Sequence, residues 1–205
     1  MTAPSPTVPA LHQAFGGAVE RAVVSCGDTI VYLRRDRLHD ALAWLKTAPE
    51  QAFDYLTDIT AVEYRDPERP LEVVWQLRSL TRKADLRVKV ALDQAGPLEV
   101  SSVYDLWKGA DWLEREVYDM FGVVFTDHPD LRRILMWETY AEGYPLRKSF
   151  PLRGHFTRAE QTRQALAANP EAHYSLDELS IADAYHELPK DMRERLRRGE
   201  RGFLK

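Results

Sequence analysis

The middle of the chain alternates apolar and polar positions in the pattern of a half-buried sheet. Residues 71–77 and 86–92 carry an apolar side chain at every second position, and a polar connection at 81–85 separates the two runs. Because successive side chains of a strand point to opposite faces, this period predicts two antiparallel strands with one buried face. The aromatic and aliphatic positions of the run 53–64 extend the predicted sheet.

Shorter signals precede this sheet. Residues 19–33 predict two strands around the turn dipeptide Gly27-Asp28. Residues 36–46 place three leucines at helical spacing, with Asp36 positioned to cap the start of the helix. Strands with helices before and after them, without regular strand–helix alternation, predict an α+β fold with a mixed or antiparallel sheet and flanking helices.

The same patterns divide the chain into three parts. Three prolines among the first nine residues predict a disordered or extended lead-in over residues 1–10. The α+β domain is expected to span residues 11–150. Residues 151–205 contain short polar helix candidates but no alternating pattern, which predicts an extended tail that wraps a partner. The end of this tail, residues 189–205, carries seven basic and three acidic residues.

Residues 111–121 predict a further helix, which holds many of the polar side chains that could do chemistry. Asp111 and Glu114 have the spacing of a capping box at its start, and Gly122 is expected to cap its end. Four apolar side chains share one side of the helical wheel and should face the core. These residues are Leu113, Val117, Met120 and Phe121.

The polar side of this helix has two interpretations. Arg115 and Asp119 lie opposite the apolar stripe, four residues apart, where they can form an ion pair, and Glu114 and Glu116 fall at its edges. The carboxylates and His128 could instead support acid–base catalysis, and a stand-alone hydrolase based on Glu116, Asp119 and His128 is therefore one alternative. Because Arg115 favours ionised carboxylates, structural ion pairing is the preferred interpretation.

Composition and charge narrow the classes of function. The chain has 28 Lys and Arg against 32 Asp and Glu, so it lacks the basic excess typical of nucleic-acid-binding proteins. RNA binding by residues 189–205 is thus a disfavoured alternative. Cys26 is the single cysteine, which excludes an intramolecular disulfide and a cysteine-ligated cluster, and we expect it to be buried. The sequence has no apolar run of about 18 residues and no signal peptide, which predicts a cytosolic protein.

Three separated blocks of sequence match one known family. The blocks read E-R-E-x-Y-D-x-F-G at 114–122, H-P-D-L-R-R-I-L at 128–135 and P-L-R-K at 145–148. In this order and spacing they closely resemble the C subunit of the proton-pumping NADH-quinone oxidoreductase, respiratory complex I. This C subunit belongs to the 30 kDa-type subunit family. The motif residues, which we expect to form an interface, are Glu114, Arg115, Glu116, Tyr118, Asp119, Phe121, Gly122, His128, Pro129, Asp130, Arg132, Arg133, Pro145, Leu146, Arg147 and Lys148.

This resemblance implies a structural role rather than catalysis by the isolated chain. The C subunit lies in the hydrophilic arm and binds no cofactor or metal itself, while the complex uses FMN, iron–sulfur clusters, NADH and quinone in other subunits. The implied partners are chiefly the D subunit and also the B subunit, with no nucleic acid. The implied location is the cytoplasmic side of the cell membrane, with membrane association only through the complex. An equivalent subunit of a related membrane-bound hydrogenase, or of a quinone reductase with another electron donor, stays open as an alternative.

Two further expectations concern the last two blocks. Arg132, Arg133 and Arg147 either bind carboxylates of a partner or bridge to acidic residues of the preceding helix, and the sequence does not separate these possibilities. Pro145 and Pro151 are expected to hold the residues between them in an extended conformation, which would suit contact along a partner surface.

Overall fold

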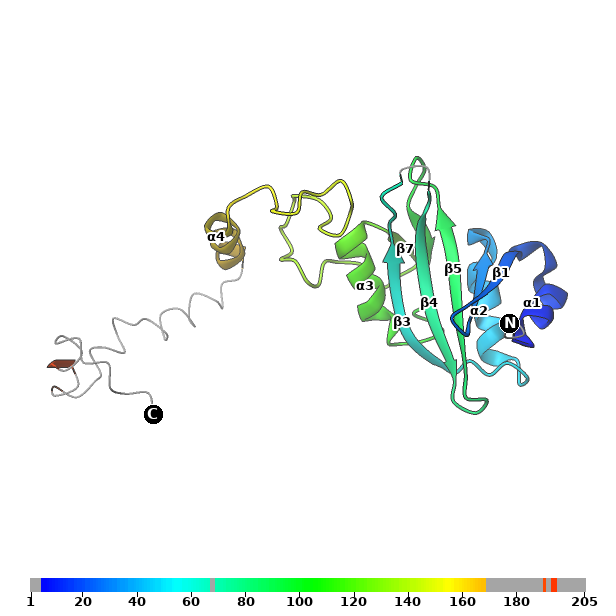
Figure 1. The fold of residues 1–205 in the computed structure, drawn as a ribbon. Coiled ribbons are helices and arrows are strands. Elements are labelled where there is room, and N and C mark those ends of the chain that lie inside the picture. The colour runs from blue at the N-terminus through cyan, green and yellow to red at the C-terminus, as the bar shows by residue number, and fades with distance from the viewer. Residues whose placement is uncertain (1–4, 67–68, 169–189, 191–192, 195–205) are drawn as a thin grey trace. The chain divides into compact units, whose positions relative to one another are not determined.

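The structure is a computed structural model (Figure 1). Contacts divide the chain between His155 and Phe156 into two compact units. The first unit contains the strands, and the second contains helix α4 (Arg158–Ala168). The residues that the structure describes are 5–66, 69–168, 190, 193 and 194.

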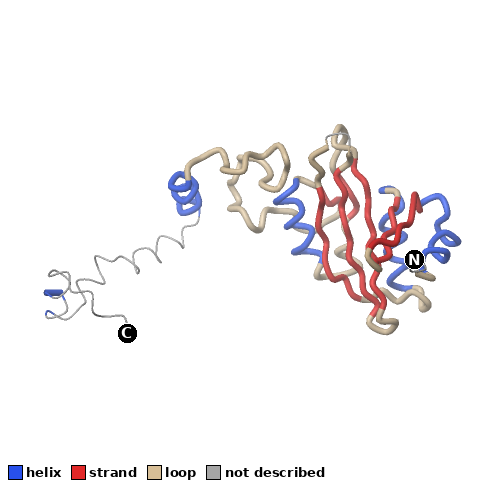
Figure 2. The backbone as a smooth tube through the Cα atoms, in the orientation of Figure 1, coloured by secondary structure: helices blue, strands red, loops and turns tan. Residues whose placement is uncertain are grey.

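Five strands form the central sheet of the first unit in the order β1–β2–β5–β4–β3. Figure 2 shows the strands in red. Every pairing is antiparallel except that of β2 with β5, which run parallel. This arrangement confirms the predicted α+β fold with a mixed sheet. The strands are β1 (Val19–Ser25), β2 (Asp28–Leu33), β3 (Tyr55–Val62), β4 (Leu71–Ser79) and β5 (Ala84–Leu92).

The alternation in β4 places Trp75 in the core, where it is completely buried. The expectation that only one face of this strand is buried is wrong, because Glu72 and Val74 on the opposite face are also buried. The Glu72 carboxylate accepts hydrogen bonds from the Tyr64 hydroxyl at 2.8 Å and from Lys89 Nζ at 2.7 Å. These two donors satisfy the charge that burial would otherwise leave unpaired.

Three helices cover one side of this sheet with apolar side chains: α1 (Thr7–Phe15), α2 (Leu38–Thr47) and α3 (Ala110–Phe121). Leu11, Leu42 and Val117 belong to the same buried cluster as the core-facing residues of the strands. A second sheet pairs two short parallel strands, β6 (Glu99–Ser101) and β7 (Val124–Thr126). In the part of the chain that the structure describes, no helix is both long and apolar enough to cross a membrane.

The N-terminal lead-in is shorter than the prolines predict. Helix α1 begins at Thr7, and both Thr7 and Val8 are buried, so the predicted disorder is wrong for residues 7–10. Pro9 lies in the first turn of the helix, where backbone amides have no partner within the helix. A proline there removes no hydrogen bond and does not interrupt the helix.

Two side chains near the first hairpin also differ from expectation. Cys26 is exposed rather than buried, because it occupies the hairpin turn with a left-handed backbone (φ 52°) next to Gly27 (φ 92°). Asp36 does not cap α2, which begins at Leu38 after a short 3₁₀ turn. Its carboxylate instead pairs with the Arg34 guanidinium at 2.8 Å.

Between β7 and the end of the first unit, residues 127–155 form turns but no helix or strand. Irregular segments longer than about 12–15 residues are uncommon in compact domains and are often functional. We call this segment the motif loop, because it contains the second and third sequence blocks. Apart from residues 190, 193 and 194, the basic segment 189–205 lies outside the described residues, so its contact with a partner stays a prediction.

Candidate functional site

The first sequence block forms helix α3, but its start differs from the predicted capping box. The helix begins at Ala110, with Gly109 as the N-cap and no side-chain hydrogen bond to the free amides. Its end agrees with the prediction, since Gly122 is left-handed (φ 78°) and its amide donates to the Tyr118 carbonyl at 2.9 Å. A Cβ on Gly122 would lie 2.4 Å from the Tyr144 ring, so glycine is required there for two reasons.

Glu114 is completely buried. Its carboxylate accepts a hydrogen bond from the Ser102 hydroxyl at 2.6 Å and one from the Val103 amide at 2.7 Å. Burial raises the pKa of Glu114 to about 7, although these two hydrogen bonds favour the ionised form. Glu114 therefore fixes the turn that follows β6 instead of capping its own helix.

The His128 side chain is also fully buried, and it closes the turn at the start of the motif loop. Its Nδ1 accepts the Asp130 amide at 3.1 Å, so in this arrangement Nε2 carries the proton and faces the Asp111 carbonyl at 3.3 Å. The Asp111 carboxylate lies 3.4 Å from the same Nε2, and Glu114 lies 4.0 Å away.

Asp119 is the strongest anchor of the motif loop. One carboxylate oxygen accepts the backbone amides of Ile134, Leu135 and Met136 at 3.0, 2.8 and 2.8 Å. The other oxygen accepts Arg133 Nη1 at 2.6 Å. Burial of the carboxyl opposes ionisation, but the three amides and the guanidinium outweigh it and hold the pKa of Asp119 below its usual value.

Arg115 contributes to the same contact between α3 and the loop. It is 7% exposed, and its guanidinium donates to the carbonyls of Arg132 and Arg133 at 3.2 Å each. The predicted ion pair between Arg115 and Asp119 is therefore wrong, since Asp119 pairs with Arg133 instead. Both side chains face the motif loop, which covers the side of α3 that the helical wheel assigned to solvent.

The third block is held by Glu63, an acidic residue directly after β3 that the sequence analysis did not single out. Its carboxylate accepts the Lys148 amide at 2.6 Å and lies 3.4 Å from Arg147 Nε. The predicted extended conformation of residues 146–150 is wrong, because consecutive turns link Arg147 to the Tyr144 carbonyl and Phe150 to the Arg147 carbonyl. The run 53–64 also contains Asp54 and Asp58, so no local signal distinguished Glu63 from the other acidic residues near it.

The three arginines of these blocks differ in their surroundings. Arg133 and Arg147 are 13% and 18% exposed and pair within the chain, with Asp119 and Glu63. Arg132 pairs with Asp130, and both of these side chains are more than half exposed. Of these three arginines, only Arg132 thus keeps a largely accessible guanidinium. The exposed residues of the motif are Glu116, Pro129, Asp130, Arg132, Leu146 and Lys148.

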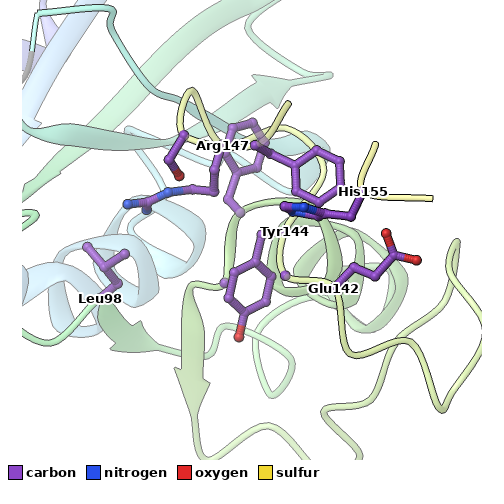
Figure 3. Close-up of a pocket in the computed structure, with 10 residues that line it drawn as sticks. Leu98, Glu142, Tyr144, Arg147 and His155 are labelled. Carbon is purple, nitrogen blue, oxygen red and sulfur yellow. The ribbon is translucent and has the colours of Figure 1, made fainter. Parts of the chain in front are cut away.

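A pocket of about 320 Å³ lies where the loop returns to the end of α3. Phe121, Tyr144 and Phe150 give it aromatic walls. Figure 3 shows the Arg147 guanidinium and the Glu142 carboxylate pointing in opposite directions, away from Tyr144. These two charged groups therefore do not pair across the pocket.

The structure does not assemble the acid–base group that the sequence made possible. The Asp119 oxygens are occupied by Arg133 and loop amides, His128 contacts Asp111 and Asp130, and Glu116 is exposed. Among the described residues, no group of three or more His, Cys, Asp and Glu side chains could hold a metal ion. The candidate functional site is therefore the motif loop and its anchors on α3 and after β3.

Comparison with known families agrees with the motif blocks. A family profile described as respiratory-chain NADH dehydrogenase, 30 kDa subunit, matches residues 31–156. The chain belongs to this family. The matched range of this 30 kDa subunit family contains α3, the motif loop and the buried acidic residues Glu63, Glu114 and Asp119.

Individual relatives support the assignment to the 30 kDa subunit family. The chain is 41% identical over 145 residues to the C subunit of NADH-quinone oxidoreductase from Maricaulis maris, covering 71% of each protein. The C/D subunit of NADH-quinone oxidoreductase from Shewanella woodyi is 40% identical over 161 residues, which are 74% of this chain but 26% of that protein. Among solved structures, a trypsin-resistant fragment of Nqo5 is 32% identical with a TM-score of 0.52, covering 61% of this chain and 98% of the fragment.

Proposed function

We propose that the chain is a non-catalytic structural subunit in the peripheral arm of a proton-translocating NADH-quinone oxidoreductase. In this complex electrons pass from NADH through FMN and iron–sulfur centres to quinone, and other subunits bind these cofactors. The observation that carries the proposal is the use of Glu114 and Asp119, the buried acidic residues of the motif, as acceptors for backbone amides. Groups that could do chemistry are instead used to fix the shape of a loop.

The proposed principal partner is the D subunit, with the B subunit in the same quinone-site module. The Shewanella woodyi protein, whose name combines the C and D subunits, supports this choice, because the region similar to this chain is about a quarter of its length. A single polypeptide that carries both names places its C and D parts at high effective concentration. Through these partners, the chain would lie peripherally on the cytoplasmic side of the cell membrane.

Co-expression with the D and B subunits of the same organism tests the proposal. We expect the three chains to elute together from size-exclusion chromatography, and the chain alone to be colourless and unable to oxidise NADH. Separate elution of folded partners would contradict the proposal. The names of the relatives favour NADH over another electron donor, and a neighbouring gene for an NADH-binding flavin subunit would support that choice.

A further inference from the structure

A second hollow of about 670 Å³ lies on the outer side of the third sequence block. This volume is within the range of about 300–1,000 Å³ that is usual for binding clefts. We call it the basic groove, and its defining residues are Arg65, Leu146, Arg147, Lys148, Phe150 and Leu152. Three of these residues are cations, and among the residues that the structure describes none that lines the hollow is acidic.

Two of the three cations that define the basic groove are available for a partner. Arg65 and Lys148 are exposed, and within the described residues neither has an ion-pair partner. Arg147 differs, since it pairs with Glu63 and is 18% exposed. A local excess of positive charge on a chain with a net charge of −4 indicates a place where an acidic group binds.

Two apolar side chains of the groove are also exposed to solvent. Leu146 is 50% exposed and Leu152 is completely exposed, at 107% of the reference value. Single exposed leucines are common on protein surfaces, but here two of them border one hollow together with Phe150. Docking of an apolar side chain would remove both leucines from water.

The backbone of the groove is already fixed before anything binds. The Lys148 amide donates to the buried Glu63 carboxylate at 2.6 Å, and the Leu146 amide donates to the Met120 carbonyl at 3.0 Å. The Phe150 amide closes a turn on the Arg147 carbonyl at 3.0 Å. A surface held in this way loses little conformational entropy on binding, which favours specific recognition.

We propose that the basic groove binds an acidic segment of a neighbouring subunit, with carboxylates against Arg65 and Lys148 and an apolar side chain between Leu146 and Leu152. This inference rests on the proposed function, because it takes the occupant from the same complex. A membrane surface fits less well, since lipid-binding clusters usually contain about four to eight cations. The groove has three, and Arg147 is mostly buried.

Photo-cross-linking in the intact complex tests the occupant directly. The photoreactive residue benzoylphenylalanine replaces Leu152, and the irradiated complex is analysed by mass spectrometry. We expect a link to a protein segment with at least two Asp or Glu residues close to the linked position. The same replacement at Leu80, which is 57% exposed at the far end of β4, is the matched control and should not link to that segment. A link from position 152 to phospholipid, a link to a segment without acidic residues, or no link would overturn the proposal.

Charge removal separates this inference from the proposed function. The double variant Arg65→Gln, Lys148→Gln should bind the partner subunits about tenfold more weakly and with less dependence on salt. The control variant Arg37→Gln, Arg78→Gln also removes two exposed cations, although these two lie in ion pairs outside the groove, and its affinity should stay unchanged. If both variants bind the partner subunits equally well, the proposal for the basic groove is overturned, but the proposed function is not. Failure of the unmodified chain to join the complex would overturn the groove together with the proposed function.

Discussion

Replacement of Asp119 by Ala tests whether a buried carboxylate on α3 holds the motif loop in place. The change removes the acceptor of three backbone amides and the partner of Arg133, a side chain that is 13% exposed. Hydrogen bonds to charged groups contribute about 1.5–3 kcal/mol each, but they are not additive within one site. Breaking a buried ion pair costs about 3–5 kcal/mol, and we expect a loss of about 4 kcal/mol in the free energy of unfolding.

Thermal unfolding and limited proteolysis measure this effect at two levels. A loss of about 4 kcal/mol should lower the melting temperature by roughly 8–16 °C for a domain of this size. Trypsin should also cleave faster after Arg133, because the backbone amides of residues 134–136 that follow it lose their acceptor on α3. Asp130→Ala is the matched control, since its carboxylate binds Arg132 at 2.8 Å in the same loop but is 59% exposed. Exposed pairs contribute about 0–1 kcal/mol, so this control should change little.

The comparison of the two variants can refute the reasoning. Equal changes in melting temperature for Asp119→Ala and Asp130→Ala would mean that burial does not determine the strength of the contact. An unchanged cleavage rate in Asp119→Ala would mean that the loop is held by other interactions. Either result would remove the physical basis for treating α3 as the support of the motif loop.

Three other predictions follow from single residues. The pKa of Glu114, about 7 in the folded chain against about 4.3 when unfolded, makes the folded state bind more protons between these values. The free energy of unfolding should therefore fall by on the order of 3 kcal/mol as the pH rises from about 4.5 to about 8. Urea unfolding of Glu114→Gln should lack this loss. Gly122→Ala should lower the free energy of unfolding by at least about 2 kcal/mol, but by only about 1 kcal/mol in a Tyr144→Ala background. Chemical unfolding of the variants in this double-mutant cycle measures both values. Ellman's reagent should label Cys26 without denaturant, and slow labelling only on unfolding would contradict its exposure.

The sheet could be predicted because its information is local. Strand β5 shows its buried face through side chains two residues apart, and the same period in β4 places Trp75 in the core. The end of α3 is equally local, since Gly122 supplies the left-handed residue that ends a helix. In both cases the sequence near the residue determines its environment.

The environment of the motif's charged residues is not local. Arg115 and Asp119 fall on the polar side of a helical wheel, which predicts solvent exposure when the helix is considered alone. They are buried because the motif loop, a segment without periodicity, folds over that side of α3. Glu63 was missed for the same reason, as its partners are about 85 residues away at Lys148 and Arg147.

Three buried acidic residues explain how an irregular loop can be well defined. Backbone amides outside helices and sheets need other acceptors, and a carboxylate offers several lone pairs to neighbouring donors. Glu114, Asp119 and Glu63 each accept at least one main-chain amide from a segment without regular structure. These carboxylates are therefore occupied by donors of the same chain. Its exposed residues are held on a fixed backbone, which is the arrangement that a specific contact with another protein of the complex requires.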